Sequence, residues 1–185
     1  MDKKSTYILM LLLAFGGFSL FISCERDDTC ADREITPFLI IRFTDNEDTS
    51  SPDDVSDLQV RYIEEVEGGD NRAVNIFNTA TDLDSITLSL PINRTSATYV
   101  FYQNFDEDII DDEIVLSAET DIDTVTFNYE VREEYISRAC GFKAVYSNLI
   151  VNRVTDGNLN SFIDNEVIIT NTIENEDQAH VHFRH

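Results

Sequence analysis

The sequence contains no tryptophan and little positive charge. Lys and Arg together number 13 against 36 Asp and Glu, which gives a formal net charge of −23. Such an excess of acid argues against binding to nucleic acid and against lying flat on an anionic bilayer, because both surfaces repel a polyanion. It favours solubility and is ordinary for a solvated surface, although it could also attract divalent cations. We therefore expect no nucleic-acid partner.

The motifs of common enzymes are also absent. There is no Gly-x-Ser-x-Gly, no His-Glu-x-x-His and no glycine-rich phosphate loop. All three histidines fall in the last six residues, so a catalytic triad would need a histidine from a chain end, where chains tend to fray. Two carboxylates meeting in a cleft could still act as acid and base, but no pair stands out among so many. We expect no enzymatic activity and no cofactor.

The first residues have the form of a secretory leader. A basic start at residues 3–4 precedes residues 7–22, which carry no charge, and Ser23 supplies a small residue before Cys24. This arrangement resembles a bacterial lipoprotein signal, although Phe21 stands where that signal usually has Leu or a smaller aliphatic residue. The resemblance implies cleavage before Cys24 and its acylation, by palmitate among other chains. The alternative is an uncleaved membrane anchor, since the apolar run approaches the roughly 20 residues that span a bilayer.

An acidic segment follows the predicted lipid site. Glu25, Arg26, Asp27 and Asp28 resemble the short signal that directs many Bacteroidota lipoproteins to the cell surface. We expect an outer-membrane protein anchored by lipid and displayed at the surface, with a periplasm-facing position as the alternative. The expected organisation is a signal peptide at 1–23, an acidic tether at 24–34 and a single domain at 35–185.

With Cys24 assigned to lipid, Cys30 and Cys140 remain for a disulfide in a compartment that permits one. The bond would close a loop of about 110 residues and contribute on the order of 4–5 kcal/mol in the chain-entropy model. A count of reversing strands puts both cysteines at the same end of the domain, provided that residues 73–77 form no strand. The alternative is a free Cys30 and a buried, inert Cys140.

From residue 35 onward the apolar residues recur with a period of two. The clearest runs are 125–131 and 86–92, and no stretch shows a sustained helical stripe. The pattern predicts an all-β, antiparallel β-sandwich of about 8–10 strands, immunoglobulin-like or similar, with a barrel as the alternative. The other expected strands are 38–44, 58–66, 98–103, 113–118, 142–150, 166–172 and 179–184, with a doubtful one at 73–77.

A short repeat opens the two clearest strands. Residues 81–88 match residues 120–127 in residue class at each position. Turn chemistry explains the match, because Asp and Thr side chains bond to nearby backbone groups before a strand begins. A second reading is modification: Ser85 and Thr124 each lie between Asp and an aliphatic residue, which resembles the Bacteroidota acceptor for O-glycosylation.

The stretch from Tyr129 to Lys143, YEVREEYISRACGFK, carries the most specific resemblance. Together with Cys24 and the strand at 38–43 it is similar to a family of uncharacterised Bacteroidota lipoproteins, whose distinctive part is the Tyr-x-Ser-Arg-Ala-Cys-Gly element. The resemblance implies lipoprotein status and a β-rich domain. It implies no activity and supplies no functional residues.

Metal sites are weakly indicated. On a strand, His180 and His182 would share the outward face and could chelate a transition metal, but no third ligand is evident. Outward polar positions on an edge strand explain them as well, so we expect no metal there. The acidic runs 106–113 and 45–54 could gather calcium oxygens, yet neither has the spacing of the helix-loop-helix calcium loop. Charged turns explain both runs equally well.

We therefore expect a non-enzymatic binding, accessory or structural module of the envelope. Its partners would be the membrane, through Cys24, and an unknown envelope protein or extracellular ligand. A glycan-binding module is the alternative, because Tyr99, Phe101 and Tyr102 share one predicted strand and one of them could face outward, although aromatic residues in strands usually lie in the core. A calcium-binding β-domain is the other alternative.

Overall fold

The structure is a computed structural model that describes residues 36–48, 51–66, 69–76, 80–110, 113–138, 140–154 and 160–185. These residues form twelve strands and no helix, so they contain no helix long and apolar enough to cross a membrane. The larger of two compact units comprises Glu34–Glu134 and Lys143–His185, and the described residues of the smaller unit lie within Tyr135–Phe142. The predicted leader and tether, with Cys24, Glu25, Arg26, Asp27, Asp28 and Cys30, lie outside the described residues.

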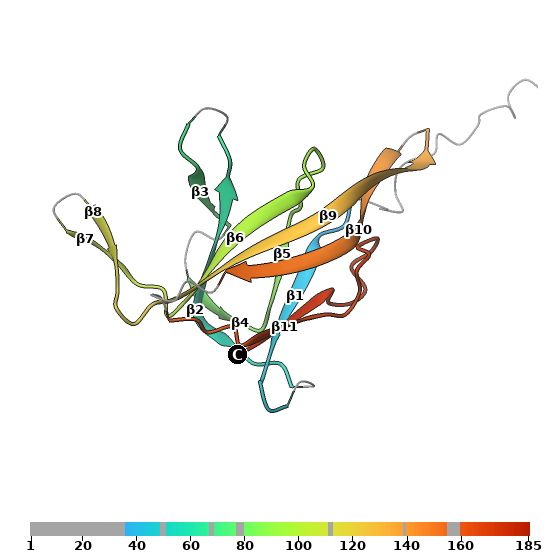
Figure 1. Cartoon of the computed structure of the whole chain (residues 1–185). Helices are drawn as coiled ribbons and strands as arrows, with labels where there is room; N and C mark the ends of the chain where they lie inside the picture. The colour runs from blue at the N-terminus through green and yellow to red at the C-terminus, as the bar shows by residue number, and fades with distance from the viewer. Residues whose placement is uncertain are drawn as a thin grey trace, which may run out of the picture. The chain divides into compact units, whose positions relative to one another are not determined.

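Two main sheets build the larger unit (Figure 1). The prediction of an all-β antiparallel sandwich is confirmed, and the sheets do not close into a barrel. One pairing is parallel, because β1 lies beside β12 with Phe43 opposite Phe183. The four-stranded sheet has the order β11 (Asn165–Ile168), β12 (Val181–Arg184), β1 (Leu39–Thr44) and β5 (Ser85–Leu88). The six-stranded sheet has the order β10 (Gly141–Val154), β9 (Asp121–Ser137), β6 (Ser96–Gln103), β2 (Val55–Glu64) and β3 (Arg72–Asn75), with β4 (Thr81–Leu83) also paired to β2; β7 (Glu107–Ile110) and β8 (Glu113–Leu116) form a separate hairpin.

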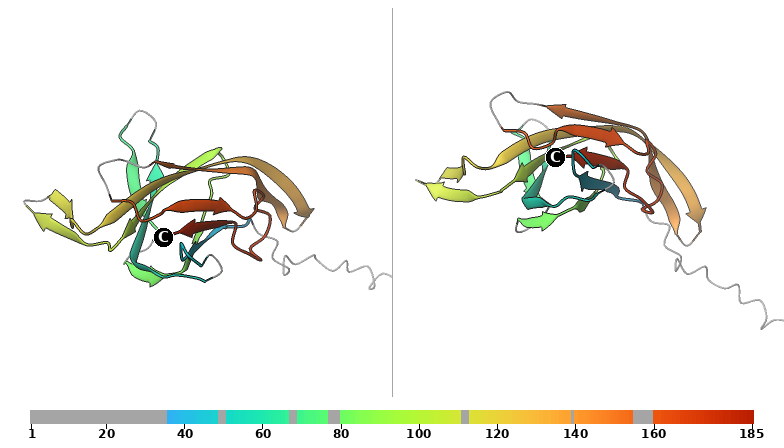
Figure 2. Two further views of the ribbon diagram at one scale, coloured as in Figure 1. Left: turned by 60° about the horizontal axis from the view of Figure 1, so that its bottom comes forward. Right: turned by 90° about the horizontal axis from the view of Figure 1, so that it is seen from below.

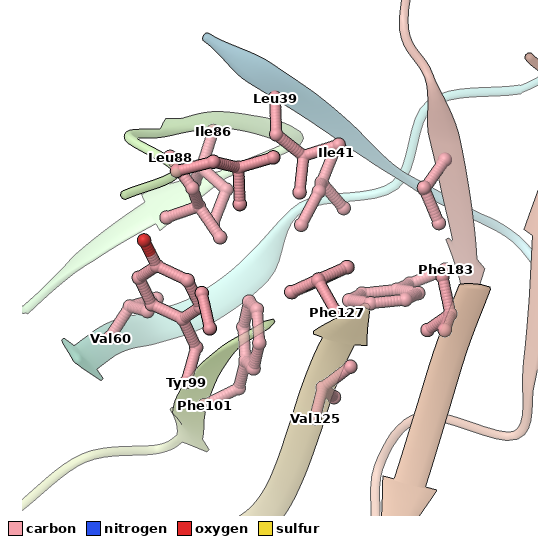
Figure 3. Packing of buried hydrophobic residues seen from close by; sticks show 14 of the residues in the cluster. Leu39, Ile41, Val60, Ile86, Leu88, Tyr99, Phe101, Val125, Phe127 and Phe183 are labelled. Atoms are coloured by element: carbon pink, nitrogen blue, oxygen red, sulfur yellow. The ribbon is translucent and has the colours of Figure 1, made fainter. Parts of the chain in front are cut away.

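The core lies between these two sheets (Figure 3). Along β9 every second residue from Asp123 to Tyr129 is buried, as the period of two predicted. Phe43 and Phe183 of the four-stranded sheet meet Phe101 and Phe127 of the six-stranded sheet, with ring centroids 5.5 Å apart for Phe101–Phe183 and 6.4 Å for Phe127–Phe183. These rings join the two layers, since edge-on and offset contacts between aromatic rings are favourable.

The strand expected at 86–92 ends early, at Leu88. Beyond it, the backbone carbonyls accept hydrogen bonds from three tyrosine hydroxyls rather than from a neighbouring strand, and Ile92 is exposed instead of inward-facing. We call this group the tyrosine cluster: Tyr99 donates to the carbonyl of Ser89, Tyr146 to that of Leu90 at 2.7 Å, and Tyr129 to that of Pro91 at 2.9 Å.

Two short segments are more regular than expected. The doubtful stretch at 73–77 contributes β3, paired with β2, and the acidic run 106–113 contributes β7 and the start of β8 rather than only a hairpin tip. The count of reversing strands that put Cys30 and Cys140 at the same end required that residues 73–77 form no strand. Since they contribute β3, that count no longer supports the placement. At the start of the domain, Thr36 Oγ1 accepts a hydrogen bond of 2.9 Å from the backbone N–H of Ala144 on β10.

Candidate functional site: the seam between the two sheets

The two sheets meet along one edge of the sandwich, which we call the seam. Strand β10, at the edge of the six-stranded sheet, runs beside the segment that follows β11. Tyr146 and Ile173 exchange both backbone hydrogen bonds, at 3.1 and 2.7 Å, and the N–H of Leu149 donates to the carbonyl of Asn171 at 3.0 Å. Figure 2 shows β11 lying beside β10 in both views. The seam is thus an antiparallel contact whose hydrogen bonds are made at one end.

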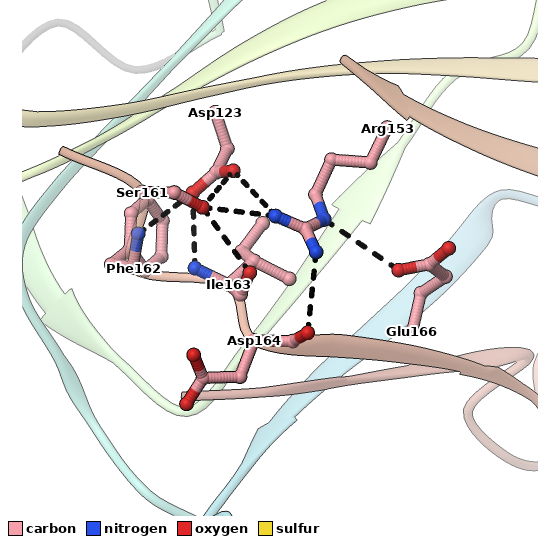
Figure 4. Close-up of polar contacts among 7 residues, drawn as sticks. All are labelled: Asp123, Arg153, Ser161, Phe162, Ile163, Asp164 and Glu166. Atoms are coloured by element: carbon pink, nitrogen blue, oxygen red, sulfur yellow. Dashed lines mark hydrogen bonds and ion pairs between the residues drawn. The ribbon is translucent and has the colours of Figure 1, made fainter. Parts of the chain in front are cut away.

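A buried carboxylate fastens the other end of the seam (Figure 4). Asp123 lies in the inward-facing row of β9 and is fully buried. Its Oδ2 accepts hydrogen bonds from the N–H groups of Phe162 at 2.9 Å and Ile163 at 3.0 Å. Its Oδ1 accepts from Ser161 Oγ at 2.7 Å and lies 3.3 Å from Nη1 of Arg153. Buried charge is stable only when paired and hydrogen-bonded, and Asp123 meets both conditions.

Arg153 carries the contact across the seam from β10. Its Nη1 also donates to Ser161 Oγ at 2.9 Å, and its Nη2 donates to the carbonyl of Asp164 at 3.2 Å. Its Nε lies 3.6 Å from the carboxylate of Glu166 on β11. The planar guanidinium suits such multiple contacts because its donors point in fixed directions. The Arg153 guanidinium therefore connects β9 of the six-stranded sheet with β11 of the four-stranded sheet and the residue before it.

The chemistry of this network is structural rather than catalytic. A serine nucleophile needs a neighbouring base that can take its proton and present the oxygen to a substrate. Ser161 instead donates to a buried carboxylate and accepts from Arg153, and no histidine is among its described contacts. The arrangement holds the chain segment before β11 against β9.

Along the seam, exposed apolar side chains alternate with exposed polar ones such as Asn148 and Asn152. Large β-branched side chains are exposed on β10 and on β11 with the residue after it. Given the antiparallel contacts at Leu149–Asn171 and Arg153–Glu166, they lie on neighbouring stretches of backbone. We call them the seam patch: Ile150 (55% exposed), Val154 (55%), Ile168 (39%) and Ile169 (45%). Grouped exposed apolar residues on a soluble domain are typical of a protein interaction surface.

One open depression of about 630 Å³ lies at the far end of β2. Arg94, which lines the depression, is bound to Glu65. Its Nη1 lies 2.6 Å from the Glu65 carboxylate, and its Nη2 donates to the Glu65 carbonyl at 3.1 Å. No aromatic side chain lines it. The lining residues are Glu65, Val66, Asn71, Arg94, Thr95 and Ser96.

The structure corrects the prediction for His180. This side chain is only 1% exposed rather than outward-facing. The Ile40 N–H donates to its Nδ1 at 2.9 Å, so Nε2 must carry the ring proton and donate to the Asn175 carbonyl at 3.0 Å. Both ring nitrogens are thus used, and burial lowers the pKa of His180 despite the opposing effects of its hydrogen bonds and of Glu176. The ring bridges β1 and the loop before β12.

His182 lies on the outer side of β12 and is half-buried. Burial, with smaller effects from Arg42 and Arg184, lowers its pKa below the ordinary histidine value. No group of three His, Cys, Asp or Glu side chains is placed to hold a metal ion within the part of the chain that the structure describes. The two histidines that the sequence singled out are therefore not brought together as a site.

The acidic runs make ordinary local contacts where they are described. Asp45 Oδ1 accepts hydrogen bonds from the N–H groups of Glu47 and Asp48, at 2.6 and 2.9 Å, which is the geometry of an Asx turn. Glu107 forms an ion pair of 2.9 Å with Arg61. The side chains of 108–114 lie outside the described residues, so calcium binding there stays a prediction.

None of the aromatic residues proposed for glycan contact is exposed, and Tyr99 and Phe101 belong to the core between the sheets. Tyr99, Phe101 and Tyr102 are all buried, so this strand presents no aromatic platform. The glycan alternative thereby loses the side chains on which it was based.

The two modification candidates are half-buried. Ser85 donates to its neighbour Asp84 at 2.9 Å, and Thr124 lies within β9 opposite Val100. Their glycosylation stays a prediction.

Cys140 lies in the turn between β9 and β10, where its N–H donates to Ser137 Oγ at 3.1 Å. Its bond to Cys30 also stays a prediction.

The network at the seam was missed from the sequence, although one signal for it was present. Asp123 stands in phase with Val125, Phe127 and Tyr129, so the period that identified the strand also placed a carboxylate in the core row. An acid in phase with a core row needs a buried partner. Which cation supplies it, Arg153, depends on a tertiary contact.

Comparison with known proteins gives one match. Residues 65–185 match the model of a family of unknown function (DUF6452), and this range includes the seam and the Tyr129–Lys143 stretch but neither Cys24 nor the strand at 38–43. No curated protein matches the chain, and no solved structure does. The chain belongs to the DUF6452 family, whose function is unknown.

Proposed function

We propose that this protein is a lipid-anchored, non-enzymatic accessory module of the bacterial outer membrane, and that its seam patch binds another protein of the envelope. The single observation that carries the proposal is the exposure of Ile150, Val154, Ile168 and Ile169 on neighbouring stretches of backbone along the seam. These side chains project from a rigid support, because backbone hydrogen bonds and the Asp123–Arg153 network hold the two strands together.

The anchoring part of the proposal draws on the sequence. The uncharged run before Cys24 and the Tyr-x-Ser-Arg-Ala-Cys-Gly element are the features that resemble Bacteroidota lipoproteins. The segment Glu25–Asp28 supports display at the cell surface. A single domain on a lipidated tether can reach a membrane-embedded partner without spanning the bilayer itself.

A protein partner fits the described surface better than a glycan or a small substrate. Glycan-binding surfaces commonly stack sugar rings on exposed aromatic side chains, and the open depression beside Arg94 has none. The hydroxyl of Ser161 is engaged by charged neighbours. The seam patch offers apolar area of the kind that protein interfaces bury at their centre.

Site-specific photo-crosslinking in intact cells tests the proposed interface. A photoreactive amino acid at Ile150 or Ile168 is expected to give a discrete heavier adduct. The matched control is Ile92, an isoleucine that is more exposed than either test position but lies in the loop before β6. Discrete adducts from the seam positions alone support the proposal. Equal labelling from Ile92, or no adduct from the seam, contradicts it.

Protease treatment of intact cells, with lysed cells as the control, tests the location. We expect the protein to be digested in intact cells, as a surface protein would be. Protection until lysis would contradict surface display and would make the partner a periplasmic protein.

A further inference from the structure

The turn between β9 and β10 exposes two aromatic rings. Tyr135 and Phe142 are 56% and 64% exposed, and their ring centroids lie 5.3 Å apart in an edge-to-face arrangement. We call residues Tyr135–Phe142 the hairpin tip. These are the largest exposed aromatic surfaces among the described residues, and neither ring contributes to the core between the sheets.

The charge of this region is opposite to that of the protein. The hairpin tip contains Arg138 and no Asp or Glu, within a chain whose net charge is −23. The hairpin tip is thus a place where an anionic surface would be attracted rather than repelled. Aromatic rings beside basic residues are the side chains that proteins place at the boundary between membrane and water.

The chain also enters the domain beside this hairpin. Thr36 is hydrogen-bonded to Ala144, which follows Phe142 by two residues. Thr36 lies twelve positions after Cys24, and even fully extended this stretch spans only about 40 Å. If Cys30 is bonded to Cys140, six residues join Cys24 to the hairpin tip, a reach of about 20 Å. A lipid on Cys24 would therefore keep the membrane surface within reach of Tyr135 and Phe142.

We propose that the hairpin tip contacts the lipid surface, with Tyr135 and Phe142 at the level of the lipid headgroups and Arg138 toward anionic lipid. The inference rests on the lipid anchor of the proposed function, and it gives that anchor a second attachment point. The lipid on Cys24 attaches the protein at one point, so a second contact adds to the attachment and fixes the orientation of the domain. Insertion is shallow, because Glu133 and Glu134 directly precede the hairpin tip and their carboxylates avoid hydrocarbon.

The absence of tryptophan makes the test direct, since one introduced tryptophan is the sole such fluorophore. Phe142→Trp and, separately, Tyr135→Trp are made in the full chain, and the acylated proteins are reconstituted into vesicles of phosphatidylethanolamine and phosphatidylglycerol. The control is Val115→Trp, at an exposed position on β8. Flotation measures anchoring, and quenching by brominated acyl chains measures contact.

We expect tryptophan at either tip position to shift to shorter wavelength and to lose about twofold in emission in brominated vesicles, as an interfacial residue would. Tryptophan at position 115 should keep its emission. Protein that floats with the vesicles but shows no quenching at the tip overturns the inference and leaves the anchor intact. Equal quenching at all three positions also overturns the inference, because the contact with lipid would then not be specific to the hairpin tip. Protein that fails to float contradicts the anchor, and the inference with it.

Discussion

At the scale of single residues, two buried polar side chains hold loop segments against the strands of the sandwich. Asp123 joins β9 to the segment before β11 and to Arg153 on β10. His180 joins β1 to the loop before β12. Each side chain accepts hydrogen bonds from main-chain N–H groups that the strand pairing does not satisfy, so these groups keep a partner.

Replacement of Asp123 by asparagine should lower the free energy of unfolding by about 2–3 kcal/mol. Asparagine offers one acceptor oxygen, whereas Phe162, Ile163, Ser161 and Arg153 all direct donors at the carboxylate. The measurement is urea unfolding followed by circular dichroism. Asp121→Asn, two residues earlier on the same strand, is the matched control and should change stability by less than about 0.5 kcal/mol. Equal effects of the two substitutions would contradict the role given to Asp123.

His180 should make the protein less stable in mild acid. Its pKa is lowered in the folded state, so the folded protein binds fewer protons than the unfolded chain. This contribution to stability is present above the unfolded pKa of about 6.5 and decreases below it by up to about 1.4 kcal/mol per pH unit. Unfolding free energies measured at pH 7.5 and 5.5 test this.

His180→Asn is the reference variant for that experiment, because asparagine keeps an acceptor for the Ile40 N–H but has no proton to gain. The wild type should lose more stability than the variant between the two pH values. His182, also lowered in pKa, is present in both proteins. If the free energy of unfolding fell by the same amount in both proteins between the two pH values, His180 would not be the titrating group.

At the scale of elements, the tyrosine cluster explains why one strand stops. The segment after β5 leaves the sheet at Ser89, and three hydroxyls from β6, β9 and β10 satisfy its carbonyls in turn. Burial raises the pKa of each tyrosine, so the neutral, donating form is favoured at any ordinary pH. The cluster ties a segment from beside the four-stranded sheet to strands of the other sheet.

Tyr146→Phe should lower the free energy of unfolding by about 1–2 kcal/mol, because the Leu90 carbonyl is buried and would lose its donor. Tyr135→Phe is the control, since that side chain is exposed, and it should be close to neutral. Thermal unfolding of both variants beside the wild type would measure the difference. A neutral Tyr146→Phe would mean that water replaces the hydroxyl at this position.

At the scale of the whole molecule, the predicted disulfide has the largest expected effect. Denatured, unreduced protein should show no free thiol if Cys24 is acylated and Cys30 is bonded to Cys140. Two free thiols would refute the bond. If the bond is present, Cys140→Ser should destabilise the protein by about 4 kcal/mol, since it releases a loop of about 110 residues.

Much of this architecture could be predicted from the period-two pattern, because burial on one face of a strand leaves a direct record in sequence. The rows in β9 and β12 are buried where the pattern placed them. The end of β5 could not be predicted, because Ile92 continues the pattern while distant tyrosine hydroxyls take the carbonyls before it. The outward position expected of His180 was wrong for the same reason: its burial follows from Ile40 and Asn175, which are remote in sequence or in a loop.

The parallel pairing of β1 with β12 has a consequence for the order in which the protein forms. About 140 residues separate Ile41 from its neighbour Val181, and pairings between such distant segments form slowly. Strand β1 can pair with β5 early in folding, but its other edge has no neighbour until β12 joins it. Phe183, which fills the space between the sheets, arrives at the same moment. An open strand edge and an incomplete interior therefore persist until β12 is in place, and a partly folded chain in that state is prone to aggregation.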